Sequence, residues 1–220
     1  MKLGLISDIH GDPIALELAW SHLTIMGADR IVCAGDLVGY GPYPDRVVEF
    51  LEEHQVASVR GNHDRWALER GLGARDEFGG GTPSRQTLER LATLPFHLVL
   101  ADLDRIGVVV HGSLRSDMEF VQRRTHPPSR LRADLTALGT DLLVFGHTHE
   151  PMWFRCDQGL VVNPGSVVSM PVVKSSSRTF ALVETADLSV TFHDVETGEP
   201  RRLEPWPDQE APPDARARRS

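Results

Sequence analysis

The stretch LGLISDIHGD, residues 3–12, decides the fold of this chain. Its first four residues form a short apolar run, which predicts a buried strand, and the polar residues that follow predict a loop. Pro13 comes directly after the loop and suits the first turn of a helix, and apolar residues recur at roughly helical spacing as far as Met26. The stretch therefore predicts a strand, a polar loop and a helix in succession.

The same succession recurs further along the chain. Arg30–Ala34 is a second apolar run that ends in a polar turn, and Asp45–Glu53 has the apolar spacing of a helix. Val56–Val59 is a third such run, again closed by a polar turn. Strands that alternate with helices predict βαβ units and a largely parallel sheet.

The rest of the chain predicts a second sheet. The expected elements are a Gly-rich mobile loop over Gly71–Ser84, helices over Ser84–Leu94 and Ser129–Leu138, a hairpin of Phe96–Leu100 and Ile106–His111 that turns at 102–104, and a strand over Leu142–Phe145. Residues Met152–Val195 are rich in strand-like runs and are expected to form a second, more antiparallel block. The simplest packing is an α/β fold of two sheets, each covered outside by helices. We expect one domain over residues 1–199 and a disordered Pro-rich tail over 200–220.

Composition excludes several classes of protein. The 220 residues carry a net charge of −8, which opposes stable binding to nucleic acid or to an anionic membrane. Two cysteines, Cys33 and Cys156, provide neither a disulfide framework nor a Cys-rich zinc site. The apolar run at the N-terminus is too short for a signal peptide, and no run reaches the length of a membrane helix. A cytoplasmic location is the expectation.

Polar side chains follow five of the apolar runs at the point where each run ends. Because ligands bind outside the carboxyl ends of strands in α/β sheets, we expect these side chains to share one edge. Each motif alone is common by chance, and each His alone is more often a turn or core residue, but the five in this order predict a common site. They are Asp8 with His10, Asp36, Asn62 with His63, His111, and His147 with His149.

The chemistry of these side chains favours two divalent metals. Asp36 can bridge them, with Asp8, His10 and His149 completing one site and Asn62, His111 and His147 completing the other. Mixed oxygen and imidazole ligands suit manganese, iron or zinc better than Cu(I) or calcium. Manganese is the expected metal, with nickel and magnesium as further alternatives. Two divalent ions would outweigh the two carboxylates, so a phosphate would be drawn to this spot of an acidic protein.

His63 has a separate role in this hypothesis. Metals about 3.5–4 Å apart can clamp the attacking and leaving oxygens of an in-line displacement and generate hydroxide near neutral pH. His63 lies beside the ligand Asn62 and could protonate the leaving oxygen as general acid. The alternative is a structural role for this histidine.

These motifs resemble those of a known family. SDIHG (7–11), GDLV (35–38), GNHD (61–64), VHG (110–112) and GHTH (146–149) are similar to the five motifs of the calcineurin-like metallophosphoesterase superfamily. The chain looks like its small bacterial and archaeal members of the YfcE phosphodiesterase type. The resemblance spans residues 3 to about 195. It implies a four-layer αββα sandwich of two mixed sheets, a dinuclear centre with the ligand roles above, a metal-bridged hydroxide as nucleophile, and a turn at Asn163–Ser166 near the metals.

Two departures from the family pattern bear on the substrate. The family's protein phosphatases and symmetrical dinucleoside tetraphosphatases carry Gly-Asp-x-Val-Asp-Arg-Gly, whereas this chain has Gly39 in place of the second Asp and Tyr40 in place of the Arg. That Asp would orient the general acid, and that Arg would grip phosphate oxygens. Their loss favours a phosphodiester, which has one fewer ionisable oxygen. Arg115 could supply a replacement charge or be a solvated loop residue; Tyr40 and Arg115 are the candidate substrate contacts.

Three functions remain as hypotheses. The first is a metal-dependent phosphodiesterase for small, nucleotide-like diesters, and the second is a phosphomonoesterase, protein phosphatase or dinucleoside polyphosphate hydrolase on the same centre. The third is a protein-interaction scaffold, as in the retromer subunit of this architecture, which predicts damaged motifs that this chain does not show. Sandwich folds of this kind can also form homodimers through exposed faces.

Overall fold

The computed structural model describes residues 1–101, 104–169 and 178–208 and contains two sheets. The first sheet has the order β11-β10-β9-β1-β2-β3, formed by Pro200–Arg201, Ser189–Asp194, Thr179–Glu184, Lys2–Ile6, Arg30–Cys33 and Ala57–Ser58. The second has the order β4-β5-β6-β8-β7, formed by His97–Leu100, Gly107–Val110, Leu142–Val144, Gly159–Asn163 and Met152–Cys156. Both sheets mix parallel and antiparallel pairs.

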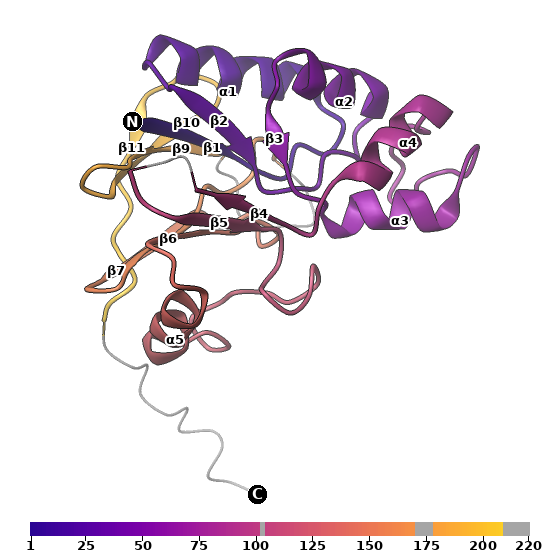
Figure 1. Cartoon of the computed structure of the whole chain (residues 1–220). Helices are drawn as coiled ribbons and strands as arrows, with labels where there is room; N and C mark the ends of the chain where they lie inside the picture. The colour runs from indigo at the N-terminus through magenta and orange to yellow at the C-terminus, as the bar shows by residue number, and fades with distance from the viewer. Residues whose placement is uncertain (102–103, 170–177, 209–220) are drawn as a thin grey trace, which may run out of the picture.

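Helices cover the outer face of each sheet, as Figure 1 shows. The helices are α1 (Pro13–Ile25), α2 (Pro44–Glu53), α3 (Asn62–Arg70), α4 (Arg85–Thr93) and α5 (Pro128–Leu138). Helices α1 and α2 lie over the first sheet, while α5 lies against the second. This confirms the predicted four-layer αββα sandwich.

Each central strand is buried on both faces. In β1, Leu3 and Leu5 face the second sheet, whereas Ile6 packs into the helix-covered core. In β5, Val109 faces the first sheet and Val108 faces the α5 side. Strands buried on two faces read as continuous apolar runs, which is why the sequence shows them so clearly.

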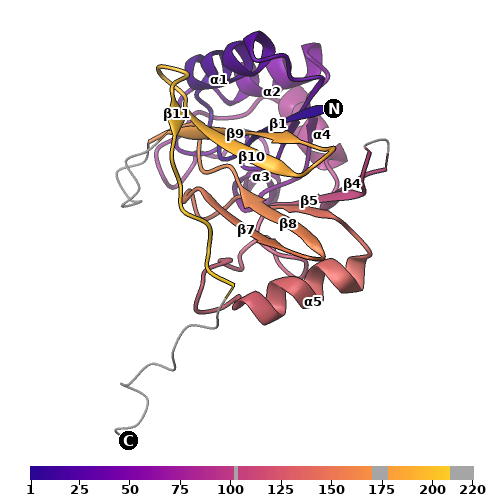
Figure 2. The same ribbon diagram turned by 90° about the vertical axis from the view of Figure 1, so that its left-hand side faces the viewer.

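The strands of Met152–Val195 do not form one block, and that prediction was wrong. Strand β8 pairs in parallel with β6 and carries β7 on its other side, so both join the second sheet. Strand β9 pairs antiparallel with β1, and β10 pairs with β9, so both join the first sheet. Figure 2 shows the two pairs lying in different layers. Pairing with β9 satisfies backbone groups of β1 that would otherwise form an exposed edge.

Helix α3 begins where the sequence predicts only a polar turn. Asn62, which comes shortly after the third apolar run, is its first residue. The Gly-rich loop, expected to be mobile, packs on the loop before α2, where the Gly81 N–H donates to the Gly41 carbonyl at 2.9 Å. Both segments therefore carry their side chains to the same end of the sheets.

Part of the predicted tail is packed on the domain. Strand β11 pairs with β10, and the Trp206 N–H donates to the carbonyl of Trp153 in β7 at 2.8 Å. Residues 209–220, and part of the turn predicted at 102–104, lie outside the described residues. None of the helices in the described part of the chain has the length and apolar character needed to span a membrane.

Candidate metal centre

The predicted ligands meet where the carboxyl ends of strands from both sheets come together. Asp8 follows β1 and Asp36 follows β2, and the Asp8 N–H donates to the Gly35 carbonyl at 3.0 Å. His111 follows β5, and its carbonyl accepts from the N–H of Gly146, the first residue of the last motif, at 2.8 Å. These bonds tie neighbouring motif loops together.

The ligand loops hold a strained backbone. Left-handed φ angles occur at Asp8 (55°), His10 (48°), Asp36 (54°), His147 (64°) and His149 (58°). The left-handed region costs roughly 1–2 kcal/mol for a residue with a Cβ, although Asp and His visit it more readily than most. Such strain collects at functional sites, because sharp turns there aim several side chains at one point.

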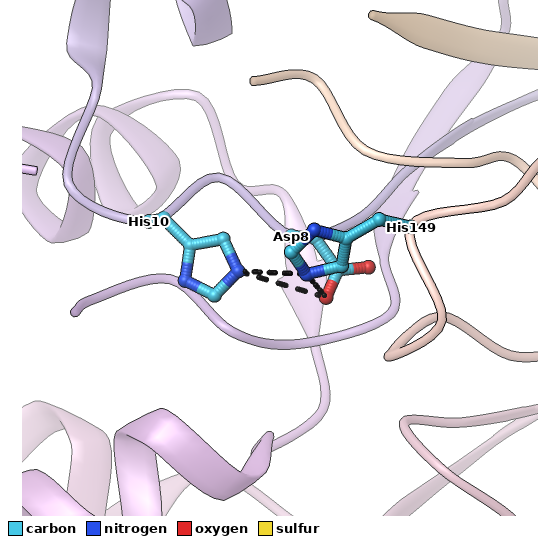
Figure 3. Close-up of side chains that lie close together, drawn as sticks. All are labelled: Asp8, His10 and His149. Atoms are coloured by element: carbon cyan, nitrogen blue, oxygen red, sulfur yellow. Dashed lines mark hydrogen bonds and ion pairs between the residues drawn. The ribbon is translucent and has the colours of Figure 1, made fainter. Parts of the chain in front are cut away.

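One group of ligand atoms is formed by Asp8, His10 and His149 (Figure 3). Nε2 of His149 lies 3.2 Å from Oδ1 of Asp8, and Nε2 of His10 lies 3.9 Å from the same oxygen. The two Nε2 atoms are 3.0 Å apart. All three side chains are buried, so their polar atoms converge on a small enclosed space.

A second group is formed by Asp36, His111 and His147. Nε2 of His111 lies 3.2 Å from Oδ2 of Asp36 and 3.0 Å from Oδ1 of Asn62. The same Asp36 oxygen lies 3.8 Å from Nε2 of His10. Asp36 thus stands between the two groups, in the position that a bridging carboxylate requires.

The polar atoms of the cluster fit a cation. Nδ1 of His111 lies 2.7 Å from the Ala34 carbonyl and donates to it, which leaves Nε2 facing Asp36 and Asn62. Oδ1 of Asp8 and Nε2 of His147 are buried without a hydrogen-bond partner among the described residues. A buried polar atom without a partner is costly, and a bound cation would supply one.

The pKa shifts of the cluster residues also fit the binding of a cation. Burial acts to raise the pKa of Asp36, but His111 and His10 hold that pKa well below its usual range. Burial lowers the pKa of His10 to about 4, so this ring is neutral near pH 7. Burial also acts to lower the pKa of His111, but Asp36 and Asp8 raise it to about 10. A metal would therefore meet ionised carboxylates and displace a proton from His111.

Hydrogen bonds from neighbouring segments fix the Asp8 loop. The Ser7 hydroxyl donates to Oδ2 of Asp8 at 2.6 Å, and the Ser166 hydroxyl donates to the Asp8 carbonyl at 2.8 Å. Nδ2 of Asn163 donates to the Gly146 carbonyl at 2.8 Å. The turn at Asn163–Ser166 therefore lies against the cluster, as expected. Ser7 is the first residue of the SDIHG motif, but its bond to Asp8 was not predicted from the sequence.

Asp64 is a second supporting residue that sequence reasoning missed. Its Oδ1 accepts from the N–H groups of Leu37 and Val38 at 2.9 and 3.1 Å, and its Oδ2 accepts from Gly61 N–H at 2.9 Å. The side chain thus ties the loop after Asp36 to the start of α3. Its place two residues after Asn62 was the available signal, because an acidic side chain in a first helical turn commonly caps free N–H groups.

His63 lies beside the cluster in a setting of aromatic rings. Its ring centroid is 4.9 Å from that of His10, 4.7 Å from Tyr40, 4.8 Å from Trp66 and 5.2 Å from Phe78. Its Nδ1 is buried and has no hydrogen-bond partner among the described residues. Neighbouring rings, rather than a carboxylate, hold this imidazole in place.

Gly39 explains the close approach of His63. A Cβ at Gly39 would lie 2.4 Å from Nδ1 of His63, and the glycine has a φ of 93°. A side chain at this position would therefore collide with the imidazole. The space beside Gly39 is occupied by the histidine itself.

The two candidate substrate contacts lie in different places. Tyr40 lines a cavity of about 510 Å³ together with His10. Arg115 lies in the loop after β5, where its N–H donates to the Ser113 hydroxyl at 3.1 Å, and it is outside the described lining of that cavity. The geometry therefore brings Tyr40, but not Arg115, to the His10 side of the cluster.

Comparison with known proteins agrees with this geometry. The sequence profile of the calcineurin-like phosphoesterase superfamily domain matches residues 1–188. The uncharacterized protein MJ0912 of Methanocaldococcus jannaschii is 40% identical over 217 residues, covering 88% of this chain and 87% of that protein. Phosphodiesterase YfcE of Escherichia coli K12 is 30% identical over 178 residues, covering 76% and 79%. The crystal structure of a metallophosphoesterase from Sphaerobacter thermophilus is 28% identical, with a TM-score of 0.69, covering 91% and 89%.

Proposed function

Because the chain belongs to the calcineurin-like phosphoesterase superfamily, we propose that it is a metal-dependent hydrolase of phosphodiesters. The observation that carries the proposal is the buried cluster of Asp and His side chains, in which Oδ1 of Asp8 and Nε2 of His147 make no hydrogen bond to the described residues. A site built from unpaired metal-ligand atoms has no structural use of its own. Its substrate would be a small phosphorylated molecule.

The proposed centre divides its ligands between two ions. Asp8, His10 and His149 would hold one ion, Asn62, His111 and His147 the other, and Asp36 both. Bound divalent ions supply Lewis-acid stabilisation of the phosphate charge and activation of the attacking water. The protein's own part is to keep Asp8 and Asp36 ionised and to orient the imidazoles through backbone carbonyls, as the Ala34 carbonyl does for His111. Manganese is the proposed metal.

His63 is proposed to donate a proton to the leaving oxygen. Its backbone N–H is held at 2.8 Å by Oδ1 of Asp36, and its ring stands between the cluster and the cavity wall at Tyr40. His63→Ala should retain the metal and lower the rate by roughly 10²–10⁴-fold. His97→Ala, which removes an exposed imidazole from β4, is the control and should leave the rate unchanged. Loss of metal from the His63 variant would instead make this residue a ligand, and an unchanged rate would remove the role.

The preference for diesters rests on Tyr40. This phenol lies 4.9 Å from the ring of His10, where related monoesterases carry a phosphate-gripping Arg. A monoester dianion needs more positive charge than a diester monoanion, and Tyr40 supplies none. Burial raises the pKa of this phenol, so it remains neutral near pH 7.

One set of assays tests the proposed function. Bis-p-nitrophenyl phosphate and p-nitrophenyl phosphate are compared as substrates, in the metal-free protein and with added manganese, nickel, zinc or magnesium. We expect faster turnover of the diester and loss of activity with a chelator. Faster monoester turnover would favour a phosphomonoesterase or a related hydrolase on the same centre. Activity that resists the chelator would rule out the metal mechanism.

A further inference from the structure

A cavity of about 510 Å³ adjoins the metal cluster at His10. His10 belongs both to the ligand group with Asp8 and to the cavity wall, so a ligand bound at the metals would extend into this space. The volume lies within the range of ~300–1,000 Å³ that is usual for small-molecule sites. The remaining wall residues are not proposed metal ligands, so their side chains can determine which substrate group the cavity accepts.

Aromatic side chains form much of the wall. Tyr40, Tyr43 and Phe78 line the cavity, and the rings of Tyr40 and Phe78 are 5.0 Å apart at an angle of 39°. Phe78 is 43% exposed and Tyr43 is 55% exposed, so both rings are accessible to a ligand. Contact with a flat ligand ring would stabilise the complex most, because offset-stacked and edge-to-face contacts contribute free energy beyond the burial of apolar surface.

The wall is fixed by backbone contacts between three loops. Gly41 N–H donates to the His10 carbonyl at 2.9 Å, and Gly81 N–H donates to the Gly41 carbonyl at 2.9 Å. A Cβ at Gly81 would meet the Pro42 carbonyl oxygen. The loop that carries Phe78 therefore rests directly on the loop that carries Tyr40 and Tyr43. A wall that is already formed binds a ligand with less loss of conformational entropy.

The charges of the wall argue against a second phosphate group. Among the described lining residues, Arg178 is a cation and Asp12 is an anion, so they balance. Arg178 also donates through Nε to the Val167 carbonyl at 3.0 Å, and Asp12 caps α1 by accepting from Ala15 N–H at 3.0 Å. A further phosphate would find no net positive charge here, whereas a neutral ring requires none.

We propose that this cavity binds a neutral aromatic ring, a nucleobase or a simpler aryl group, carried by an ester oxygen of the substrate. The inference rests on the proposed function, which places the phosphate at the metals. The inference adds the chemical class of the group that the ester oxygen carries. Diesters that bear an aromatic ring are then better substrates than diesters of small alkyl groups.

Binding of phosphonates tests the inference without turnover, because the carbon–phosphorus bond is not a phosphoester. Phenylphosphonate, cyclohexylphosphonate and methylphosphonate are titrated calorimetrically into the manganese-loaded protein. Stacking of one ring predicts that phenylphosphonate binds about tenfold more tightly than methylphosphonate, and more tightly than cyclohexylphosphonate. Phe78→Ala and Tyr43→Ala should each reduce this preference several-fold and leave methylphosphonate unchanged. Leu72→Ala is the control, since this residue is 55% exposed on the same loop and lies outside the described lining.

Equal affinity for the three phosphonates, or a preference that survives both alanine variants, would overturn the inference. Equal affinity for the phenyl and cyclohexyl compounds would also overturn it, because the site would then be apolar rather than aromatic. Adenosine 5′-monophosphate compared with ribose 5-phosphate distinguishes the two sources of the ring: tighter binding of the former supports a nucleobase. Because no arm needs hydrolysis, a failure of the proposed diesterase activity would be seen separately in the turnover assays.

Discussion

At the scale of single residues, Gly39 and His63 depend on each other. Most interactions of the cluster join polar side chains to one another or to the backbone, but here a ring occupies the space that a Cβ would need. Gly39→Ala should push the His63 imidazole away from Tyr40 and lower the rate by at least about tenfold. The metal content should be unchanged, because the proposed ligands do not touch the new methyl group.

Gly73→Ala is a matched control for this substitution. Gly73 has a φ of 79°, close to the 93° of Gly39, but a Cβ there would meet nothing within 4 Å. Both variants therefore carry a similar backbone penalty, of order 1 kcal/mol, and only Gly39→Ala carries the collision. Turnover and thermal denaturation are measured for both. If the two variants behave alike in rate and stability, the packing account of Gly39 is wrong.

At the scale of elements, Asp64 joins the loop after β2 to helix α3. Asp64→Asn keeps an oxygen for Leu37 and Val38 but turns an amide N–H toward the N–H of Gly61. A buried donor without an acceptor costs about 1–3 kcal/mol, so the midpoint of denaturation should fall. The affinity for metal should fall too, because Asp36 and Asn62 lie at the two ends of this connection. Calorimetric metal titration and urea denaturation measure the two effects.

Asp45→Asn serves as the control for the loss of a carboxylate. Oδ1 of Asp45 accepts from Ser84 N–H at 2.9 Å and from the Thr87 hydroxyl at 2.6 Å, joining α2 to α4 away from the cluster. We expect this variant to bind metal as the unaltered protein does. Normal metal affinity in Asp64→Asn would show that the connection is unimportant for the site.

The C-terminal segment is a second element-scale feature. Trp206 packs against the core beneath the second sheet, and Nε1 of Trp153 donates to the Leu203 carbonyl at 3.0 Å. Trp206→Ala should lower stability by roughly 1–3 kcal/mol and leave activity per bound metal unchanged, since Trp206 packs on a core cluster that contains none of the proposed ligands. Arg202→Ala, whose side chain is 92% exposed, should change neither. Equal stability of the two variants would show that the segment contributes nothing to the domain.

At the scale of the whole molecule, the sequence predicted the layers but not all the pairings. Apolar runs ending in Asp or His identified β1, β2, β5 and β6, because strands buried on both faces leave a local signal. The places of β9 and β10 were missed, since pairing with β1 joins residues far apart in the chain and depends on the exposed edge of β1 rather than on local pattern. Strand β11 was missed because two exposed residues give no periodicity.

The site was predicted more completely than its surroundings. The candidate ligands are brought together as their motifs implied, because each stands at the end of a strand. The aromatic rings around His63 could not be predicted, since Phe78 reaches it from a Gly-rich loop without periodic structure. Asp64 was visible in its motif, but its bonds to the loop after Asp36 are tertiary and have no sequence signal.

Metal should also stabilise the molecule as a whole. A ligand that binds the folded protein and not the unfolded chain raises stability in proportion to RT ln(1 + [L]/Kd). Asp8 and Asp36 are buried carboxylates that a bound cation would stabilise, so removal of metal should lower the melting temperature, and manganese should restore it in a concentration-dependent way. Differential scanning calorimetry with and without a chelator measures the change, and an unchanged melting temperature would contradict the expectation.

The most direct test of the central claim is the number of metal ions that each chain binds. The protein is stripped with a chelator, dialysed against manganese and analysed by inductively coupled plasma mass spectrometry, with Asp36→Asn treated in parallel. The account predicts two ions per chain in the unaltered protein and a clear loss in the variant, because Asp36 lies between both groups of ligands. Trace binding in the unaltered protein, or undiminished binding in Asp36→Asn, would contradict it.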